Sequence, residues 1–272
     1  MNDYSQFIES ALQEAADLAR NYFGNVSSSV KAGDNNQVLT EADLAIGKLL
    51  VDKVRAAYSD HNVIDEEAGV IDNHSNFTWV IDPVDGTSNF ANGSPLYGIL
   101  LGLLDGGQPI AGGIALPSLG EVCVATKGKG AYCNGKRIQV SQETQLLNSL
   151  VAYGIDGHQE NPDLTYREVD GLADIVLGIR NLRSSNSVVD MAYVAKGVYG
   201  ASLNRTSKIW DNVAPQIIIE EAGGVCTDFF GQPMDYSNPL TRVDQNFTFC
   251  GSAPELHRQL QTIIKAGSRA GK

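Results

Sequence analysis

The sequence predicts a mixed α/β protein, with a largely antiparallel sheet in its first half and alternating strands and helices in its second half. Short apolar runs between residues 62 and 126 follow one another closely and are interrupted by glycine and proline, as in neighbouring antiparallel strands. After residue 149, strand-length runs alternate with longer helical patterns, which favours an α/β layer. The 272 residues, 43% of them apolar, suffice for a large core. Because no disordered linker separates residues 1–148 from residues 149–272, we expect the two halves to share a large interface.

Two helices are expected ahead of the first sheet. Residues 4–22 carry apolar side chains near helical spacing, and Gly24 supplies a stop. Thr40 is followed three positions later by Asp43, a variant of the capping box, so a second helix should begin there and run through Val54.

The strands of the first half are expected at residues 62–65, 79–81, 97–104, 110–116 and 121–126. The second half should contribute strands at 150–153, 198–203, 225 and 247–250. Its helices are expected at 163–176, 188–195, 211–221 and 254–265.

The composition argues against several classes of partner. The 20 basic residues against 32 acidic ones give a formal net charge of −12, so a basic surface for nucleic acid is not expected. The start of the chain fits an amphipathic helix rather than a signal sequence, and the longest apolar run is broken by Gly98 and Gly102. We therefore expect a cytoplasmic protein with no nucleic-acid or membrane partner.

Four widely spaced cysteines predict buried, reduced thiols: Cys123, Cys133, Cys226 and Cys250.

The segment 81–87, with the sequence IDPVDGT, is the strongest candidate for a functional site. It places Asp82 and Asp85 three residues apart where an apolar strand ends in a tight turn, so both carboxylates and the Val84 carbonyl should face one space. Backbone amides at the start of the following helical turn would suit a phosphate oxygen, and they belong to Gly86, Thr87 and Ser88. Taken alone, the same letters also fit an ordinary turn, in which Asp-Pro and Asp-Gly are common.

Further acidic residues stand in similar positions, which favours a functional interpretation. Glu66 and Glu67 follow the apolar run 62–64, and Asp211 begins a helix after Trp210. An N-terminal cap is the structural alternative for Asp211. Clustered carboxylates select hard cations such as Mg²⁺, and they would repel an anionic substrate unless cations reversed the local field. The sequence thus predicts a magnesium site that adjoins backbone amides for a phosphate group, and the expected partner is a small phosphorylated metabolite.

Three sequence blocks resemble the inositol monophosphatase family: IDEEAG at 64–69, WVIDPVDGTSNF at 79–90 and WDNVAPQIIIEEAGG at 210–224. Their order and separation also agree with the family, and the similarity spans nearly the whole chain. The resemblance implies a layered αβαβα sandwich of the sugar-phosphatase type. It also implies Mg²⁺-dependent hydrolysis of a small phosphate monoester by metal-activated water, inhibition by Li⁺, and a homodimer.

The same resemblance assigns two to three Mg²⁺ ions to five residues. Glu66, Asp82 and the Val84 carbonyl would hold one ion. Asp82, Asp85 and Asp211 would hold a second ion. A third, more weakly bound ion would be coordinated by Glu66 and water. Most of these ligands lie in residues 1–148, whereas residues 149–272 carry the last aspartate and the substrate pocket.

The catalytic residues implied by the resemblance are Glu66, Thr87 and Asp43. Thr87 and Asp43 would be hydrogen-bonded and, with Glu66, would orient and deprotonate the attacking water. Their structural alternatives are a helix cap for Thr87 and a capping-box acid for Asp43. No covalent nucleophile is expected, since the sequence has no GxSxG or P-loop motif and its four histidines lack HExxH spacing.

The pocket departs from the family pattern at two places. Ser185-Asn186-Ser187 stands where the family usually carries Gly-Ser/Thr-Ala. Asn204 stands seven residues before Asp211, where relatives that use inositol phosphates commonly have glutamate. The substrate-binding set implied by the resemblance is Asp85, Gly86, Thr87, Ser88, Ser185, Asn186, Asn204 and Asp211.

These departures leave the substrate open. Inositol monophosphate or a related sugar or polyol phosphate is the main expectation, and the alternatives are fructose bisphosphate, histidinol phosphate and a nucleoside 3′,5′-bisphosphate. Arg183, Arg205 and Lys208 could contact a second phosphate or an acidic group, or could be solvated surface charges. A non-catalytic metal-binding homologue is disfavoured because every inferred ligand and Thr87 remain.

Overall fold

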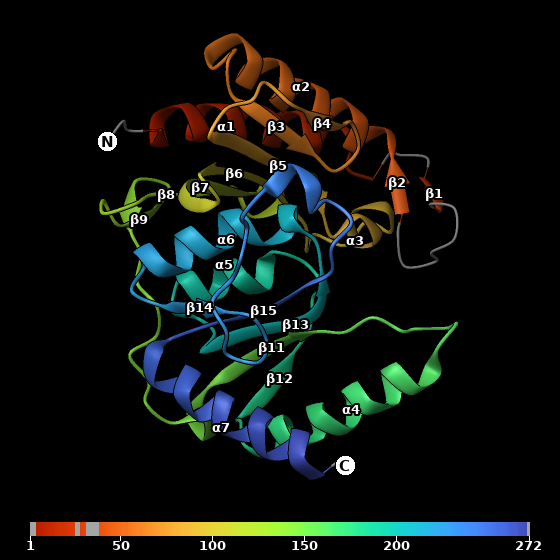
Figure 1. Cartoon of the computed structure of the whole chain (residues 1–272), viewed down its shortest axis with the longest axis vertical. Helices are drawn as coiled ribbons and strands as arrows, with labels where there is room; N and C mark the ends of the chain where they lie inside the picture. The colour runs from red at the N-terminus through yellow and green to blue at the C-terminus, as the bar shows by residue number, and fades with distance from the viewer. Residues whose placement is uncertain (1–3, 25–27, 31–37, 271–272) are drawn as a thin grey trace.

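Five layers of secondary structure stack along the long axis of the molecule, in the order helices, sheet, helices, sheet, helices (Figure 1). The computed structural model describes residues 4–24, 28–30 and 38–270. The layered αβαβα sandwich is therefore confirmed, with buried apolar side chains between successive layers. Within these ranges no helix combines the length and the apolarity needed to cross a membrane.

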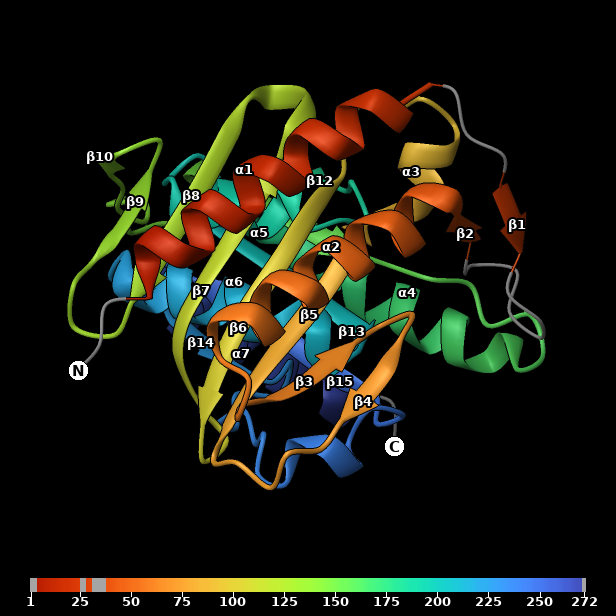
Figure 2. The same cartoon turned by 90° about the horizontal axis from the view of Figure 1, so that it is seen from above.

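The first layer consists of α1 (Ser5–Tyr22) and α2 (Glu41–Ala57), which lie across the outer face of the first sheet (Figure 2). Both helices occupy the predicted segments. The predicted capping box is present, because an oxygen of Asp43 accepts the N–H of Thr40 at 2.8 Å and Thr40 Oγ1 accepts the N–H of Ala42 at 3.2 Å. This cap holds the Asp43 carboxylate buried at the start of α2.

The first sheet has eight strands: β3 (Asn62–Asp65), β4 (Gly69–Ile71), β5 (Phe77–Asp85), β6 (Gly98–Asp105), β7 (Gln108–Leu116), β8 (Glu121–Thr126), β9 (Ala131–Cys133) and β10 (Lys136–Arg137). Their order across the sheet is β10-β9-β8-β7-β6-β5-β3-β4. Every neighbouring pair is antiparallel except β3 and β5. The largely antiparallel sheet predicted for the first half is confirmed.

The middle layer is formed by α5 (Val189–Ala195) and α6 (Ile209–Glu221), both from the second half of the chain. α6 packs against β6 and β7 of the first sheet and against β14 and β15 of the second. It approaches β7 closely because glycine occupies the contact position: a Cβ at Gly112 would lie 2.9 Å from Ala214 Cα. The two halves therefore share the large interface that the sequence predicts.

The second sheet has five strands: β11 (Leu150–Gly154), β12 (Asn181–Arg183), β13 (Ala201–Ser207), β14 (Val225–Thr227) and β15 (Phe247–Ser252). Their order is β12-β11-β13-β15-β14, with β11 parallel to both of its neighbours and β15 antiparallel to both of its own. The outermost layer holds α4 (Pro162–Leu177) and α7 (Pro254–Ala270) (Figure 1). Every strand of the first sheet precedes residue 149 and every strand of the second follows it.

Several very short elements lie outside the sequence-based prediction. They include β4, β9, β10 and β12, together with β1 (Ser28–Val30) and β2 (Val38–Thr40). Two or three residues cannot display a hydrophobic period, so these strands depend on the neighbours that pair with them. The one-turn helix α3 (Thr87–Ala91) begins where the sequence suggests a helical turn.

The prediction of four reduced thiols is wrong for one pair. Cys123 on β8 faces Cys133 on β9 in the strand register, and the two residues form a disulfide. Their separation in the sequence matches no thiol motif, so only the pairing of the strands reveals that they meet. Cys226 and Cys250 are free and buried, as predicted.

Candidate active site

Two of the predicted metal ligands lie where β5 leaves the first sheet. Asp82 is buried, and its Oδ1 accepts the backbone N–H of Val84 at 3.0 Å. In a regular strand, residues three positions apart face opposite sides of the sheet. The register between β5 and β6 shifts between Asp82 and Asp85, and such an irregularity removes the alternation and lets both carboxylates face one space.

Asp211 reaches the same space from the second half of the chain. It is the third residue of α6, and its Oδ2 accepts the backbone N–H of Lys208 at 2.6 Å. One carboxylate oxygen from each of Asp82, Asp85 and Asp211 lies within 4.8 Å of the other two. Because a carboxylate has two oxygens, Asp211 can cap its helix and also join this group, which we call the three-aspartate group.

The three carboxylates repel one another at this distance. Burial, and then repulsion from Glu66, Asp85 and Asp211, raises the pKa of Asp82 well above its ordinary value. Burial and repulsion from Asp211 likewise raise the pKa of Asp85, and burial raises the pKa of Asp211 to about 6. A cation would relieve this repulsion, so the charges fit a metal.

The donor atoms indicate which kind of metal fits. Three carboxylates beside the Val84 carbonyl form an oxygen-only set, which suits a hard cation such as Mg²⁺ rather than a metal that prefers thiolate or imidazole. Glu66 lies beside them directly after β3, where its N–H donates to the Ile81 carbonyl at 3.3 Å. Its charge raises the pKa of both Asp82 and Asp85. Three of the five predicted ligands therefore converge, the charge of Glu66 acts on two of them, and the Val84 carbonyl belongs to the same turn as Asp82 and Asp85.

The predicted pair Thr87 and Asp43 is in hydrogen-bond contact. Thr87 Oγ1 lies 3.3 Å from Asp43 Oδ1 and 2.8 Å from the Val84 carbonyl, and either oxygen can accept its proton. The other oxygen of Asp43 accepts both the N–H and the hydroxyl of Thr40. Burial raises the pKa of Asp43 in spite of these bonds. The structural alternatives also hold, since Thr87 begins α3 and Asp43 completes the capping box.

The loop before α5 joins the second half directly to this site. The backbone N–H of Val188 donates to Asp85 Oδ1. Gly86 has a left-handed φ of 83°, and a Cβ there would lie only 2.8 Å from Ser187 Cβ. The turn that carries the aspartates and the loop that follows β12 therefore hold each other in place.

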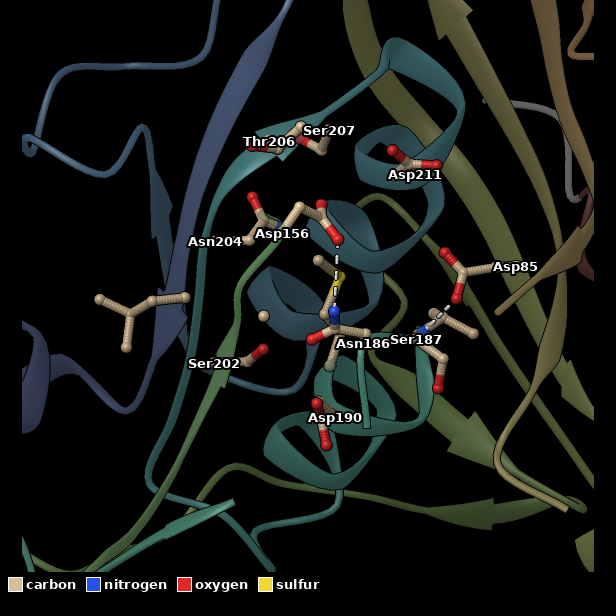
Figure 3. A pocket seen from close by; sticks show the side chains of 14 residues that line it. Asp85, Asp156, Asn186, Ser187, Asp190, Ser202, Asn204, Thr206, Ser207 and Asp211 are labelled. Atoms are coloured by element: carbon tan, nitrogen blue, oxygen red, sulfur yellow. Dashed lines mark hydrogen bonds between the residues drawn. The ribbon is translucent and has the colours of Figure 1, made fainter. Parts of the chain in front are cut away.

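A cavity of about 140 Å³ opens beside the three-aspartate group (Figure 3). Its lining includes four of the predicted substrate-binding residues: Asp85, Asn186, Asn204 and Asp211. The other four do not line it: Gly86, Thr87, Ser88 and Ser185. The first three of these form the turn that starts α3, on the side of the aspartates.

Two of the predicted loop residues have a structural role that the sequence does not suggest. The Asn186 amide donates to the Ile155 carbonyl at 2.8 Å and accepts the Ile155 N–H at 3.1 Å, so it ties the loop to the end of β11. Its φ of 48° is left-handed, a conformation in which asparagine is enriched. The Ser185 N–H donates to Asp190 at 2.9 Å, and its carbonyl accepts a hydrogen bond from Asn89 at 2.8 Å. Asn186 lines the cavity itself, and Ser185 fixes the loop that carries Asn186.

The cavity also contains polar residues that the sequence analysis missed: Asp156, Asp190, Ser202, Thr206 and Ser207. Asp156 comes just after the buried strand β11. A carboxylate at a strand end is the signal that pointed to Glu66 and Asp82, so the same reasoning could have found it. No pattern in the sequence distinguishes Ser202, Thr206 and Ser207.

Comparison with known proteins agrees with this geometry. The sequence model described as "Inositol monophosphatase family" matches residues 2–265. The chain belongs to the inositol monophosphatase family. Its relatives include Inositol-1-monophosphatase ImpA of Mycolicibacterium smegmatis, 34% identical over 247 residues, with 89% of this chain and 86% of the relative covered. Fructose-1,6-bisphosphatase/inositol-1-monophosphatase of Aquifex aeolicus is 29% identical over 240 residues, which cover 88% of this chain and 90% of the relative. Nus factor SuhB of Escherichia coli is 30% identical over 216 residues, which cover 79% of this chain and 80% of the relative.

Solved structures of the family share the fold. The IMPase of Thermotoga maritima superposes with a TM-score of 0.84 at 26% identity, covering 97% of this chain and 98% of its own. The inositol monophosphatase of Anabaena superposes with a TM-score of 0.82 at 27% identity, covering 97% and 95%. The family is generally metal-dependent, in agreement with the acidic cluster. Its members carry different names, so membership does not by itself select a substrate.

Proposed function

We propose that this protein is a Mg²⁺-dependent phosphatase that hydrolyses a small phosphate monoester, inositol monophosphate or a related sugar or polyol phosphate. The observation that carries the proposal is the three-aspartate group, whose oxygens converge within 4.8 Å beside a cavity of about 140 Å³. The carboxylates supply a place for cations, and the cavity supplies a place for the group that leaves the phosphate. Family membership and the names of the relatives support the same reaction.

The metal would be held by Asp82, Asp85 and Asp211, together with Glu66 and the Val84 carbonyl. These oxygens are sufficient for two to three ions that share carboxylates. When bound, Mg²⁺ would offset the charge of the phosphate and make a nearby water more acidic.

Thr87 and Asp43 would provide the path for the proton of that water. Thr87 Oγ1 can accept a hydrogen bond from water while it donates its own proton to Asp43 Oδ1, 3.3 Å away. Because burial raises the pKa of Asp43, this carboxylate is a better proton acceptor than an exposed aspartate. Glu66 would help to orient the same water. The backbone N–H groups of Gly86, Thr87 and Ser88 would hold phosphate oxygens at the start of α3.

The test is phosphate release from a panel of inositol, sugar, histidinol and nucleotide phosphates, measured over a range of Mg²⁺ concentrations and in EDTA. We expect Mg²⁺-dependent release by the wild type and a loss of about 100-fold or more in Asp82→Asn, the size of loss expected when a stabilising charge contact is removed. Asp105→Asn, at the exposed end of β6, removes the same charge outside the site and should leave the rate unchanged. Near-normal turnover by Asp82→Asn would refute the metal-site assignment.

Two further outcomes separate the alternatives. Mg²⁺ binding without release from any substrate would identify a non-catalytic metal-binding homologue. Release from fructose bisphosphate, histidinol phosphate or a nucleoside 3′,5′-bisphosphate in preference to the polyol phosphates would select one of these instead. Inhibition by Li⁺ and a homodimer in light scattering are expected from the family resemblance.

A further inference from the structure

The loop between β12 and α5 forms one wall of the cavity. Its residues Asn186, Ser187 and Val188 line the cavity, and residues 184–188 belong to neither a helix nor a strand. Residues outside helices and strands lack a regular ladder of backbone hydrogen bonds, so individual contacts must hold them. The contacts that fix this loop therefore also fix the wall of the cavity.

One end of the loop is fixed by apolar packing. The Val188 side chain is 1% exposed and packs so closely on β6 that a Cβ at Gly98 would collide with it. In this position the Val188 N–H donates to Asp85 Oδ1. The Val188 end of the loop therefore has its own anchor, beside the three-aspartate group.

Asp190, on α5, fixes the other end of the loop. Its carboxyl group accepts the Ser185 N–H at 2.9 Å, and its own N–H donates to the Ser187 carbonyl at 3.1 Å. These two bonds close the chain on itself around Asn186, whose φ of 48° is left-handed. A left-handed conformation in a residue other than glycine persists where the surrounding contacts hold it.

The Asp190 carboxyl group lies inside the protein rather than at its surface. It is 4% exposed, and in Figure 3 it lies below Asn186 and Ser187 in the lining of the cavity. Burial raises the pKa of Asp190, and hydrogen bonds from Ser185 act in the opposite direction. A carboxyl group offers an acceptor oxygen to an N–H whether or not it carries a proton. The bond to Ser185 therefore requires an oxygen at this position rather than a charge.

We propose that Asp190 is a positioning residue, whose carboxyl oxygen holds the loop so that Asn186 and Ser187 form the wall of the cavity that faces the leaving group. This inference rests on the proposed phosphatase function and adds to it a residue outside the three-aspartate group. Removing the oxygen frees the Ser185 end of the loop, while the Val188 end keeps its own anchor. The loss should therefore fall on substrate binding more than on the metal ligands.

The test compares three substitutions of Asp190. Asp190→Asn keeps the size of the side chain and an acceptor oxygen but removes the charge, whereas Asp190→Ala removes the oxygen. Asp190→Glu keeps the charge and adds a methylene, which displaces the oxygen in a buried position. Glu168→Ala is the matched control, because Glu168 is also 4% exposed and accepts the Tyr153 hydroxyl at 3.0 Å, but does not line the cavity.

The first measurement is kcat and KM with inositol monophosphate, or with the member of the phosphate panel that the wild type hydrolyses fastest. We expect Asp190→Ala and Asp190→Glu to raise KM by about tenfold and to change kcat by less than about threefold, as for the loss of one hydrogen bond to a carboxylate that supports binding. Asp190→Asn should keep KM within about twofold of the wild type. Glu168→Ala should lower stability and leave KM unchanged.

Two outcomes of the kinetics would overturn the inference. If Asp190→Asn raises KM as much as Asp190→Ala, the charge matters rather than the position of the oxygen. If Glu168→Ala raises KM equally, the effect belongs to any buried carboxylate. Should Asp190→Ala fail to fold, the contrast between Asp190→Glu and Asp190→Asn decides the same point.

Hydrogen exchange separates this inference from the proposed function, because it needs no turnover. Exchange of the backbone N–H groups of residues 185–188 is followed by mass spectrometry without substrate. It should be about tenfold faster in Asp190→Ala and Asp190→Glu than in the wild type, Asp190→Asn and Glu168→Ala. If the wild type releases no phosphate but this pattern appears, the proposed function fails and the hold of Asp190 on the loop stands. If the wild type is active and neither exchange nor KM changes in Asp190→Ala, only the role of Asp190 fails.

Discussion

Replacing Gly86 by alanine should damage both stability and turnover, because the two halves of the chain touch at this glycine. Its φ of 83° is left-handed, which costs an alanine about 1–2 kcal/mol. The new Cβ would lie 2.8 Å from Ser187 Cβ and 3.1 Å from the Leu96 carbonyl oxygen. Carbon atoms pack best at about 3.5–4.0 Å, so the Ser187 loop would have to move by roughly 1 Å. Overpacking of this kind costs about 1–3 kcal/mol, and together the two effects predict a loss of about 2–5 kcal/mol.

The turnover of Gly86→Ala should fall by more than the loss of folded protein explains. The Ser187 loop also supplies the N–H that Val188 donates to Asp85, so a shift of the loop moves a proposed metal ligand. A displacement of about 1 Å near reacting groups can cost about 100-fold in rate. Urea unfolding measures the first effect, and Mg²⁺-dependent phosphate release from folded protein measures the second.

Gly93→Ala is the matched control for Gly86→Ala. Gly93 has a similar φ of 73°, and a Cβ there would have no atom within 4 Å. This variant should lose about 1–2 kcal/mol from its backbone conformation and keep its turnover. Adding Ser187→Gly to Gly86→Ala removes the atom at 2.8 Å and should restore part of the activity. Equal losses of stability and turnover in Gly86→Ala and Gly93→Ala would refute the reasoning.

Three further predictions concern the carboxylates and the proposed proton path. In EDTA, the free energy of unfolding should fall as pH rises from about 4 to about 6, because folding raises the Asp211 pKa from 3.8 to about 6; this stabilisation is complete below the lower value and is lost on passing the upper one. Urea titrations at several pH values measure it, and a rise in stability over that range would contradict the prediction. Because the three carboxylates repel one another, Asp82→Asn should raise the melting temperature in EDTA and abolish the increase in melting temperature that Mg²⁺ gives the wild type. Calorimetry that finds a lower melting temperature for this variant in EDTA would count against mutual repulsion. Thr87→Val should lower kcat by about 100-fold while Thr87→Ser retains most of it, because serine keeps the hydroxyl near Asp43 Oδ1; similar losses in steady-state assays of both variants would exclude a role for that hydroxyl.

Elements long enough to show a period were predictable from the sequence. The helices α1 and α2 occupy the predicted segments, and the Thr40 and Asp43 capping box is present as expected. Of the strands of two or three residues, the sequence predicted only β14, because the others depend on the edge that each one pairs with. The disulfide between Cys123 and Cys133 was missed for the same reason, because strand register brings the two cysteines together.

The sequence by itself predicted the carboxylate-bearing turn of the proposed site, because the chemistry of that turn is local. Asp82, Val84 and Asp85 share one turn, and the contacts that shape such a turn lie within a few residues of it. Tertiary structure decided which other charges join them. α6 brings Asp211 to that turn across the interface of the two halves, and the Arg205 guanidinium lies over the rings of Phe229 and Phe230 rather than in the lining of the cavity. Electrostatic energy depends on separation in space, so the charges that surround the proposed site follow from packing that the order of residues does not display.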